Sequence, residues 1–291
     1  MSVIINKLDS IQLLGVLGTG HFGIVLKFKF TSINLNDSGR IDQKFGALKF
    51  EKQTETDEGI IKEYTIWRNA QQKLRRTLPK TQQILTSKIL GLFKFDYENK
   101  TRLGVGMKFY ESTLTELVKS SFNIKNVVSD MIQGVSQLHS CGIIHGDLAK
   151  RNFLVDKKRR VIITDFGLAH KTSRKAKDSS MYSENYSDVY SLEQPGIQPI
   201  FSLAPEVLRS VMKSSPLSLT FSSDVYMLGL AVLELLQADT FVPFKSDKTV
   251  MNGAVQYMVG FQKCNENGFG FVSRSLKIRI ILKPTCILAY F

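Results

Sequence analysis

The chain has 291 residues, of which 43% are hydrophobic, and it carries a formal net charge of +13. This length leaves room for one large domain or two small ones, and the apolar content is ordinary for a globular core. The charge suits an anionic partner such as nucleic acid, lipid or an acidic protein segment, but no RNA-binding signature or zinc-ligand spacing accompanies it, so we expect no nucleic-acid partner.

Cysteines and apolar stretches bear on the compartment. The three cysteines form no C-x-x-C pair, which indicates reduced packing residues rather than a disulfide framework: Cys141, Cys264 and Cys286. The N-terminal segment MSVIINKLDS lacks the long apolar run of a signal peptide. The longest apolar stretch, Met227–Leu236, is interrupted by Glu234 and falls short of the roughly 20 residues that span a bilayer. We therefore expect no membrane span and a cytoplasmic protein, with the nucleus as an alternative.

An apolar run, Ile11–Val16, leads into a turn that is rich in glycine. The glycines are Gly18, Gly20 and Gly23. Because glycine has no Cβ, it lets backbone N–H groups approach phosphate oxygens closely. The stretch predicts a strand, a phosphate-binding turn and a second strand, with a plain hairpin turn as the alternative.

The next segments predict a loop, a strand and a helix. Turn residues within Thr31–Gln43 indicate a long hairpin loop, and Gly46–Phe50 is typical of a third strand. Lys49 lies in this apolar strand, where a charged ammonium needs an anionic partner. From Glu55 to about Arg76, apolar residues recur at helical spacing: Ile60, Ile61, Tyr64 and Trp67.

Further along, two more strands are predicted around Ile89–Tyr97 and Leu103–Phe109. A long helix is predicted over Asn126–Cys141, and Gly142 suits its termination.

Three oxygen-bearing side chains, those of Asp147, Asn152 and Asp165, flank two short β-branched runs. The runs, Phe153–Asp156 and Val161–Thr164, predict a hairpin. Such a hairpin would hold two carboxylates and a carboxamide at one rim. Magnesium prefers a few hard oxygen ligands together with phosphate oxygens, so the sequence predicts a magnesium site there.

These motifs resemble those of the protein kinases. HGDLAKRN at 145–152, followed by DFGLA at 165–169, resembles the family's catalytic loop and magnesium motif. The glycine-rich stretch resembles the lid G-x-G-x-F-G-x-V, Lys49 resembles the V-A-I-K lysine, and Ala204–Glu206 resembles A-P-E. The resemblance covers Leu13 to about Leu236 well, and its motifs follow one another in the family's order.

The resemblance implies an α+β, two-lobed protein-kinase fold. Residues 1–108 would form an N-lobe, with an antiparallel five-stranded sheet plus one helix, and residues 109–291 a mainly α-helical C-lobe. It also implies ATP and Mg2+ as cofactors and a protein substrate whose hydroxyl receives the γ-phosphoryl group.

The resemblance assigns roles to single residues. Asp147 would orient the acceptor hydroxyl, and Asn152 and Asp165 would hold magnesium. Arg151, or alternatively Lys150, would neutralise phosphate charge or contact the base. Trp67 would stack with His145 and Phe166. The expected nucleotide-binding residues are Leu17, Gly18, Gly20, Phe22, Gly23, Val25, Ala47, Lys49, Glu63, Met107, Phe109 and Leu154. Of these, Glu63 is preferred over Glu58 as the partner of Lys49 because its distance from the lysine along the chain fits the family.

Gly146 departs from the family, because the usual H-R-D is H-G-D here. That arginine normally pairs with a phosphorylated activation loop, so we expect an enzyme that does not need such a phosphate. H-G-D also resembles small-molecule kinases of the aminoglycoside and choline type, but those generally lack D-F-G-L-A and A-P-E. An ATP-binding pseudokinase scaffold is the other alternative.

The acceptor residue is less clearly encoded. Ala149 and Arg151 after Asp147 resemble the tyrosine-kinase loop, whereas Phe201 and Ser202 depart from the tyrosine pattern. Tyrosine is favoured slightly. The resemblance makes Asp165 to Glu206 the activation segment, in which five exposed side-chain hydroxyls are candidates for modification, with an ordinary polar loop as the alternative: Ser179, Ser180, Tyr182, Tyr186 and Tyr190.

The last fifty-five residues fit the family poorly. Lys283 stands where the family has the arginine that pairs with Glu206, and lysine lacks the bidentate geometry, so a weaker brace is expected.

Overall fold

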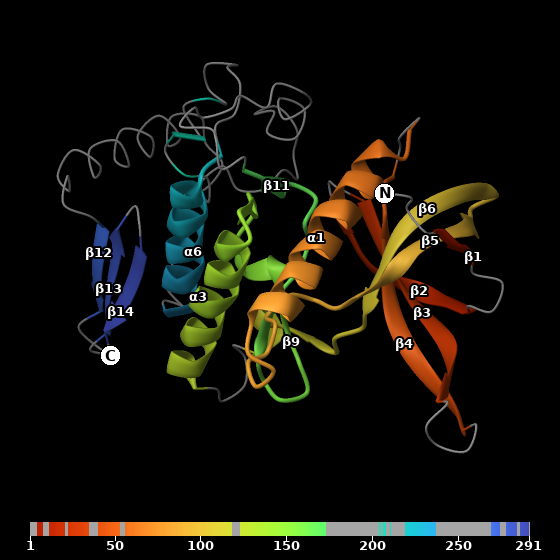
Figure 1. The fold of residues 1–291 in the computed structure, drawn as a ribbon, viewed down its shortest axis with the longest axis horizontal. Helices are drawn as coiled ribbons and strands as arrows, with labels where there is room; N and C mark the ends of the chain where they lie inside the picture. Colours follow the sequence, from red (N-terminus) through yellow and green to blue (C-terminus); the bar gives the residue numbers. More distant parts are fainter. Residues whose placement is uncertain are drawn as a thin grey trace.

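The computed structural model has two lobes, a twisted sheet with one long helix and a helical lobe beside it (Figure 1). It describes residues 5–7, 12–20, 23–34, 40–52, 56–117, 123–172, 204, 206–207, 210, 219–236, 269–273, 278–283 and 286–290. The α+β, two-lobed architecture predicted from the sequence is confirmed.

The N-lobe is built on a six-stranded sheet in the order β1-β5-β6-β4-β3-β2. Strands β2 to β6 are antiparallel neighbours, which confirms the predicted five-stranded sheet. Short β1 adds a sixth strand, parallel to β5, that the sequence did not predict. The bounds are β1 Ile5–Lys7, β2 Gln12–Gly20, β3 Gly23–Asn34, β4 Arg40–Phe50, β5 Ile89–Tyr97 and β6 Lys100–Lys108.

The loop predicted over Thr31–Gln43 is shorter than expected. Strands β3 and β4 stay paired as far as Asn34 opposite Arg40. The paired ends contain Ile33 and Ile41, and β-branched residues favour a continued ladder. Only 35–39 lies between the strands, and these turn residues are outside the described part of the chain.

Strand alternation divides the sheet into two faces. One face carries a buried aromatic and aliphatic cluster formed by Leu26, Phe28, Leu48, Phe50 and Phe95. Successive side chains of a strand point to opposite faces, so the neighbours of Leu48, Ala47 and Lys49, lie on the other face. That second face is directed toward the larger buried cluster, which contains Ala47, Trp67 and Val105 together with C-lobe residues.

Helix α1, Glu58–Thr77, buries one face at helical spacing, with Ile60, Tyr64, Trp67, Gln71 and Leu74 among its buried residues. Its second half is fixed to the segment before β5 by buried hydrogen bonds. The carbonyl of Ser87 accepts from Trp67 Nε1 at 2.9 Å and from Gln71 Nε2 at 2.5 Å. Gln71 also accepts from the Ile89 N–H. These bonds hold α1 in one position against the sheet.

The C-lobe is organised around two long helices, α3 Ile124–Ser140 and α6 Phe221–Leu236, which lie side by side (Figure 1). The side chain of Asn123 caps α3 by accepting from the backbone N–H groups of Lys125 and Asn126. Shorter elements complete the described lobe: β7 Ser112–Thr113, α2 Leu114–Leu117, β8 Ile143–Ile144, η1 Lys150–Asn152, β9 Phe153–Val155, β10 Val161–Ile163 and β11 His170–Lys171.

The described residues after Phe269 form a three-stranded antiparallel sheet, which the sequence did not predict. Its strands are β12 Phe269–Ser273, β13 Ile278–Lys283 and β14 Cys286–Tyr290. Among all described residues, none of the helices is both long and apolar enough to cross a membrane.

We predict that Gln71→Leu lowers the free energy of unfolding by about 1–3 kcal/mol, because the Ile89 N–H would lose a partner inside the protein. Urea denaturation measures the loss. Gln72→Leu, at a half-buried neighbouring position, is the matched control and should stay within about 0.5 kcal/mol of the parent. Equal losses in both variants would contradict the role given to Gln71.

Candidate functional site

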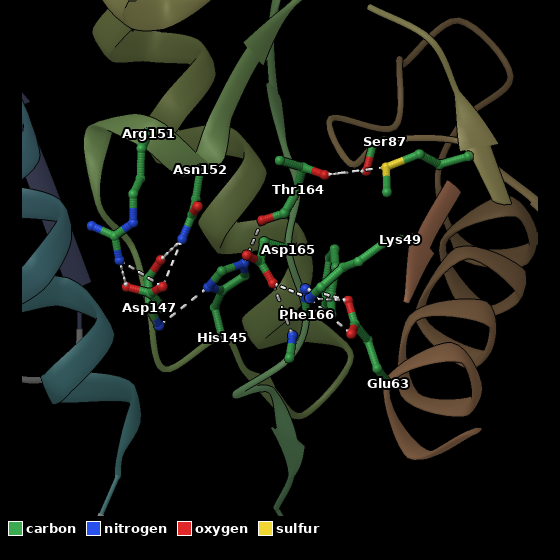
Figure 2. A network of polar contacts seen from close by, with 12 residues as sticks. Lys49, Glu63, Ser87, His145, Asp147, Arg151, Asn152, Thr164, Asp165 and Phe166 are labelled. Carbon is green, nitrogen blue, oxygen red and sulfur yellow. Dashed lines mark hydrogen bonds and ion pairs between the residues drawn. The ribbon is translucent and has the colours of Figure 1, made fainter. Parts of the chain in front are cut away.

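A buried cation joins the two lobes at the centre of the site (Figure 2). Lys49 on β4 contacts both carboxylate oxygens of Glu63 on α1 at 2.9 Å. Its ammonium also bonds Asp165 Oδ1, which follows β10. Lys49 and Glu63 are each 5% exposed. The anionic partner predicted for Lys49 is therefore present, and it is Glu63 rather than Glu58.

Burial and pairing shift the protonation of this triad. Burial alone would lower the pKa of the Lys49 ammonium, but the charges of Asp165 and Glu63 outweigh it and hold that pKa above its ordinary value. Burial also opposes ionisation of Asp165, yet Lys49 holds the Asp165 pKa below its usual range. Burial raises the pKa of Glu63 despite the nearby ammonium. One cation between two buried carboxylates thus favours the ionised form of Asp165 most strongly.

The second cluster lies on the loop before β9 and centres on Asp147, which is 2% exposed. Arg151 Nη2 donates to both carboxylate oxygens of Asp147 at 2.8 Å. Asn152 Nδ2 donates to Asp147 Oδ2 and to the Asp147 carbonyl, each at 2.8 Å. These bonds fix the carboxylate from two sides, while the Arg151 side chain remains 45% exposed.

The β9–β10 hairpin brings Asn152 and Asp165 together, as the sequence predicted. Phe153 pairs with Ile163, and one position further the Asn152 carbonyl accepts from the Thr164 N–H at 3.0 Å. Asp165 has a φ of 65°, a left-handed conformation that aspartate tolerates better than most residues. The two oxygen donors therefore sit at neighbouring positions on one rim.

The donor set fits magnesium chemically. In the described part of the chain, no group of three His, Cys, Asp or Glu residues is arranged to hold a metal. A cation at this rim would thus depend on Asn152, Asp165, water and ligand phosphates. Magnesium commonly binds in this way, through one or two carboxylates plus substrate phosphates.

A buried carboxylate on α6 supports the loop from behind. Asp224 is 0% exposed, and it accepts from the backbone N–H groups of His145 at 2.8 Å and Gly146 at 2.9 Å. The ring of His139 on α3 lies 2.9 Å from the same carboxylate. The sequence analysis did not predict this contact. Full hydrogen bonding is what lets a carboxylate be buried here.

Gly146 stands at a position that an ordinary side chain would strain. Its φ is +78°, and an added Cβ would lie 2.9 Å from the Leu168 carbonyl and 3.1 Å from Leu219 Cδ1. The glycine therefore suits both the backbone conformation and the space available.

Stacked rings tie the two clusters together. Trp67 on α1 stacks on Phe166, with centroids 5.0 Å apart and ring planes 16° apart. Phe166 in turn packs against His145, with centroids 5.2 Å apart. The predicted packing of these three residues is confirmed. His145 also bonds the Thr164 carbonyl and accepts the Asp147 N–H, so its ring links the Asp147 loop to the end of β10.

The sheet supplies a wall beside Lys49. Cross-strand pairing sets Val25 beside Lys49 and Ala47 beside Met107, which puts these side chains on one face. The residues of β2, including Leu17, Gly18 and Gly20, are exposed, and Gly20 pairs with Gly23 of β3. Phe22 lies outside the described residues. Phe109 follows β6, and Leu154 on β9 is half-buried.

A polar chain behind this wall was not foreseen. Ser87 Oγ donates to Thr164 Oγ1 at 3.0 Å, and Thr164 Oγ1 donates to Met107 Sδ at 3.6 Å (Figure 2). The hydroxyl that precedes Asp165 is the only sequence signal for it. These two hydrogen bonds hold the Met107 thioether in place.

The segment after Asp165 is described only in part. Ala204 is buried, and Glu206 Oε1 accepts from Ser223 Oγ on α6 at 2.8 Å. This contact anchors the end of the segment. The hydroxyls singled out from the sequence, together with Phe201 and Ser202, lie in 173–203, outside the described residues.

A sheet lobe and a helical lobe that meet at a lysine, a magnesium-type donor pair and a fixed aspartate define the protein kinase class. A model of the protein kinase domain matches residues 11–277, and the chain belongs to that family.

Two curated relatives are kinases by name. The chain is 33% identical over 112 residues to "Probable CTD kinase subunit alpha homolog" of Encephalitozoon cuniculi, a match that covers 38% of this chain and 28% of that protein. It is 30% identical over 159 residues to "Fatty acyl-CoA synthetase and RNA processing-associated kinase 1" of Saccharomyces cerevisiae, covering 53% of this chain and 18% of that protein. The matches span less than a third of either relative.

We predict that Gly146→Ala lowers the free energy of unfolding more than Gly142→Ala does. Both glycines have left-handed φ values, and L residues pay about 1–2 kcal/mol there. Only Gly146 adds a contact below 3.0 Å, since the nearest atom to an added Cβ at Gly142 is 3.6 Å away. Thermal or urea unfolding of both variants measures the difference, and equal losses would contradict the crowding inferred at Gly146.

Proposed function

We propose that the chain is a protein kinase that transfers the γ-phosphoryl group of Mg-ATP to a hydroxyl of a protein substrate. The observation that carries this proposal is the ion pair of Lys49 with Glu63 and Asp165, formed beside the fixed Asp147–Asn152 cluster. Family membership supports the same activity.

The nucleotide would lie against the sheet wall. In this proposal Lys49 contacts phosphate oxygens while Glu63 keeps its ammonium in place, and the backbone of β2 covers the phosphates. The expected adenine neighbours are Val25, Ala47, Met107, Leu154 and the backbone at Phe109. Leu17, Gly18, Gly20, Phe22 and Gly23 complete the lid. Asn152 and Asp165 would hold Mg2+, which when bound supplies positive charge to the transferring phosphoryl group.

Asp147 would orient the acceptor hydroxyl and accept its proton. Its carboxylate already takes bonds from Arg151 and Asn152, so its direction is set before substrate arrives. Arg151, whose side chain is half in solvent, would bring its positive charge near the phosphate. Catalysis would come chiefly from positioning and charge neutralisation.

Activity without activation-loop phosphorylation is part of the proposal. Gly146 offers no guanidinium to pair with a phosphate, and its backbone is instead held by Asp224. The loop therefore has a fixed support inside the chain. We also favour tyrosine slightly as the acceptor residue. The cation beside the Asp147 carboxylate is Arg151, four residues further along the chain, and the position two residues after Asp147 carries no lysine.

The remaining assignments are of the same kind. We place the division between the lobes at residues 108 and 109, where β6 ends. We propose the cytoplasm, with the nucleus as the alternative, because Cys141 is a free buried thiol and suits a reducing compartment.

We predict that Asp147→Asn reduces phosphoryl transfer to a mixed peptide panel by about 10³-fold, because the amide cannot accept the proton of the acceptor. Nucleotide affinity should change by less than about threefold, since Asp147 acts on the acceptor side. Radiolabelled ATP measures transfer, and phosphoamino-acid analysis of the product identifies the acceptor.

Asp96→Asn makes the same chemical change at an exposed position on β5 and should leave transfer unchanged. Magnesium-dependent nucleotide binding without transfer in the parent, unaltered by Asp147→Asn, would favour a pseudokinase scaffold. Transfer to amino-alcohols with none to peptides would favour a small-molecule kinase.

We predict that Asp165→Asn weakens ATP binding in the presence of Mg2+ by more than about tenfold and has much less effect in EDTA, because the site would lose its one charged magnesium ligand. Isothermal titration in the two buffers measures both affinities. An equal loss in both buffers would show that Asp165 acts through Lys49 alone, and the magnesium assignment would then be wrong.

A further inference from the structure

A large groove opens on the C-lobe between the N-terminal end of α3 and the turn that joins β9 to β10. Its volume is about 1010 Å3. A smaller hollow of about 310 Å3 adjoins it, between the same turn and the segment after β6, and both are lined by Arg159. None of the residues assigned to nucleotide, metal or phosphoryl transfer lines the larger groove.

The groove is strongly basic. Among the described residues that line it, Asp130 is the one carboxylate and four side chains are cationic: Lys125, Lys158, Arg159 and Arg160. Arg160 already neutralises that carboxylate, with Nε 2.9 Å from both oxygens of Asp130. The backbone N–H of Val161 donates to Asp130 as well. Cationic side chains thus outnumber carboxylates among the described lining residues, which makes the field in this basic groove positive.

The turn that presents these charges is ordered by its own hydrogen bonds. Asp156 Oδ1 accepts from the backbone N–H groups of Lys158 and Arg160, each at 2.8 Å. Asp156 Oδ2 accepts from Gln83 Nε2 at 3.0 Å. A preorganised turn lowers the entropy lost when a ligand is bound.

Apolar side chains line the groove beside the charged ones. Ile124 is half-buried and Val127 is buried, both on the first turn of α3. None of the described lining residues is aromatic, so this part of the chain offers bases no stacking surface there. A concave site also suits a chain segment better than the flat surface of a membrane. Charge complementarity therefore favours a peptide with acidic side chains and an apolar anchor.

The groove and the candidate catalytic rim lie at opposite ends of one hairpin. Asn152 and Asp165 flank the start of β9 and the end of β10, and the turn lies beyond Val155. Three strand residues span roughly 10 Å. A segment held in the groove would thus keep a hydroxyl elsewhere in the same protein at high local concentration near Asp147.

We propose that the basic groove is a docking site for an acidic segment of the protein substrate, one that carries an apolar anchor residue and is separate in sequence from the phosphorylated hydroxyl. This inference rests on the proposed kinase function. Docking lowers KM for substrates that carry the segment and leaves kcat unchanged, because the bound segment does not touch the reacting atoms.

The kinetic test compares two acceptor peptides that share one phosphorylation sequence and one flexible glycine-serine linker. One ends in six glutamates and a leucine, and the other in six glutamines and a leucine. The double variant Lys125→Glu/Lys158→Glu should raise KM for the glutamate peptide about tenfold, because two attractive contacts become repulsive. Its kcat, and both constants for the glutamine peptide, should be unchanged.

Lys94→Glu/Lys100→Glu makes the same change of charge at exposed positions on β5 and β6 and is the matched control. Equal effects of both double variants on KM would mean general attraction by a basic protein and would overturn the proposal. Lys125→Gln/Lys158→Gln should give an intermediate KM, and a melting temperature measured on each variant identifies any loss of fold.

A binding measurement separates failure of this inference from failure of the kinase proposal. Fluorescence anisotropy with the labelled glutamate peptide needs no phosphoryl transfer, and binding that Lys125→Glu/Lys158→Glu abolishes would support the site even in an inactive chain. Binding that this variant leaves intact would overturn the site even in an active kinase. A labelled six-nucleotide single strand that binds more tightly than the peptide, and is lost in the same variant, would assign the groove to nucleic acid and would equally overturn the proposal.

Discussion

The buried ammonium of Lys49 is the constraint on which the rest of the structure depends. An unpaired charge at 5% exposure would cost several kcal/mol, so the fold is stable only if carboxylates reach it. They come from α1 and from the end of β10, segments far apart in sequence that the ion pair makes mutually dependent. The stack of Trp67 on Phe166 and the bonds of Gln71 to Ser87 keep these carriers in place. Packing of α1 and of Phe166 thus keeps Glu63 and Asp165 within reach of the Lys49 ammonium.

In the helical lobe, the buried side chain of Asp224 is the group that holds the neighbouring segments together. It is a buried carboxylate, and its partners are the backbone N–H groups of His145 and Gly146 together with the ring of His139. These contacts have a consequence for the loop that carries Asp147. Helix α6 bonds the backbone N–H groups of His145 and Gly146, while the carboxylate of Asp147 accepts from Arg151 and Asn152. Helix α6 therefore fixes the loop's position through backbone groups of the loop.

Motifs and periodicity predicted the parts of the molecule that local sequence controls. The β9–β10 hairpin, the helix face of Trp67 and the pairing of Lys49 with Glu63 follow from spacing and family resemblance. The strands β12–β14 were missed, although their β-branched and aromatic runs were visible, because the resemblance ended before them. The hydrogen bonds of Gln71 and Thr164 could not be predicted, since each depends on which distant carbonyl or thioether the packed fold brings within reach.

The same contacts bear on how such an enzyme would be controlled. Kinases are commonly switched by moving the helix that carries the glutamate or by charging the activation loop. Here α1 is held inward by side chains of its own chain, and Gly146 supplies no cation to receive a phosphate. Under the proposed function, neither movement of α1 nor phosphorylation of the activation loop has an evident way to control activity. Control would then depend on which protein substrate reaches Asp147. The basic groove can make that choice, because it lies at the far end of the hairpin that positions Asn152 and Asp165.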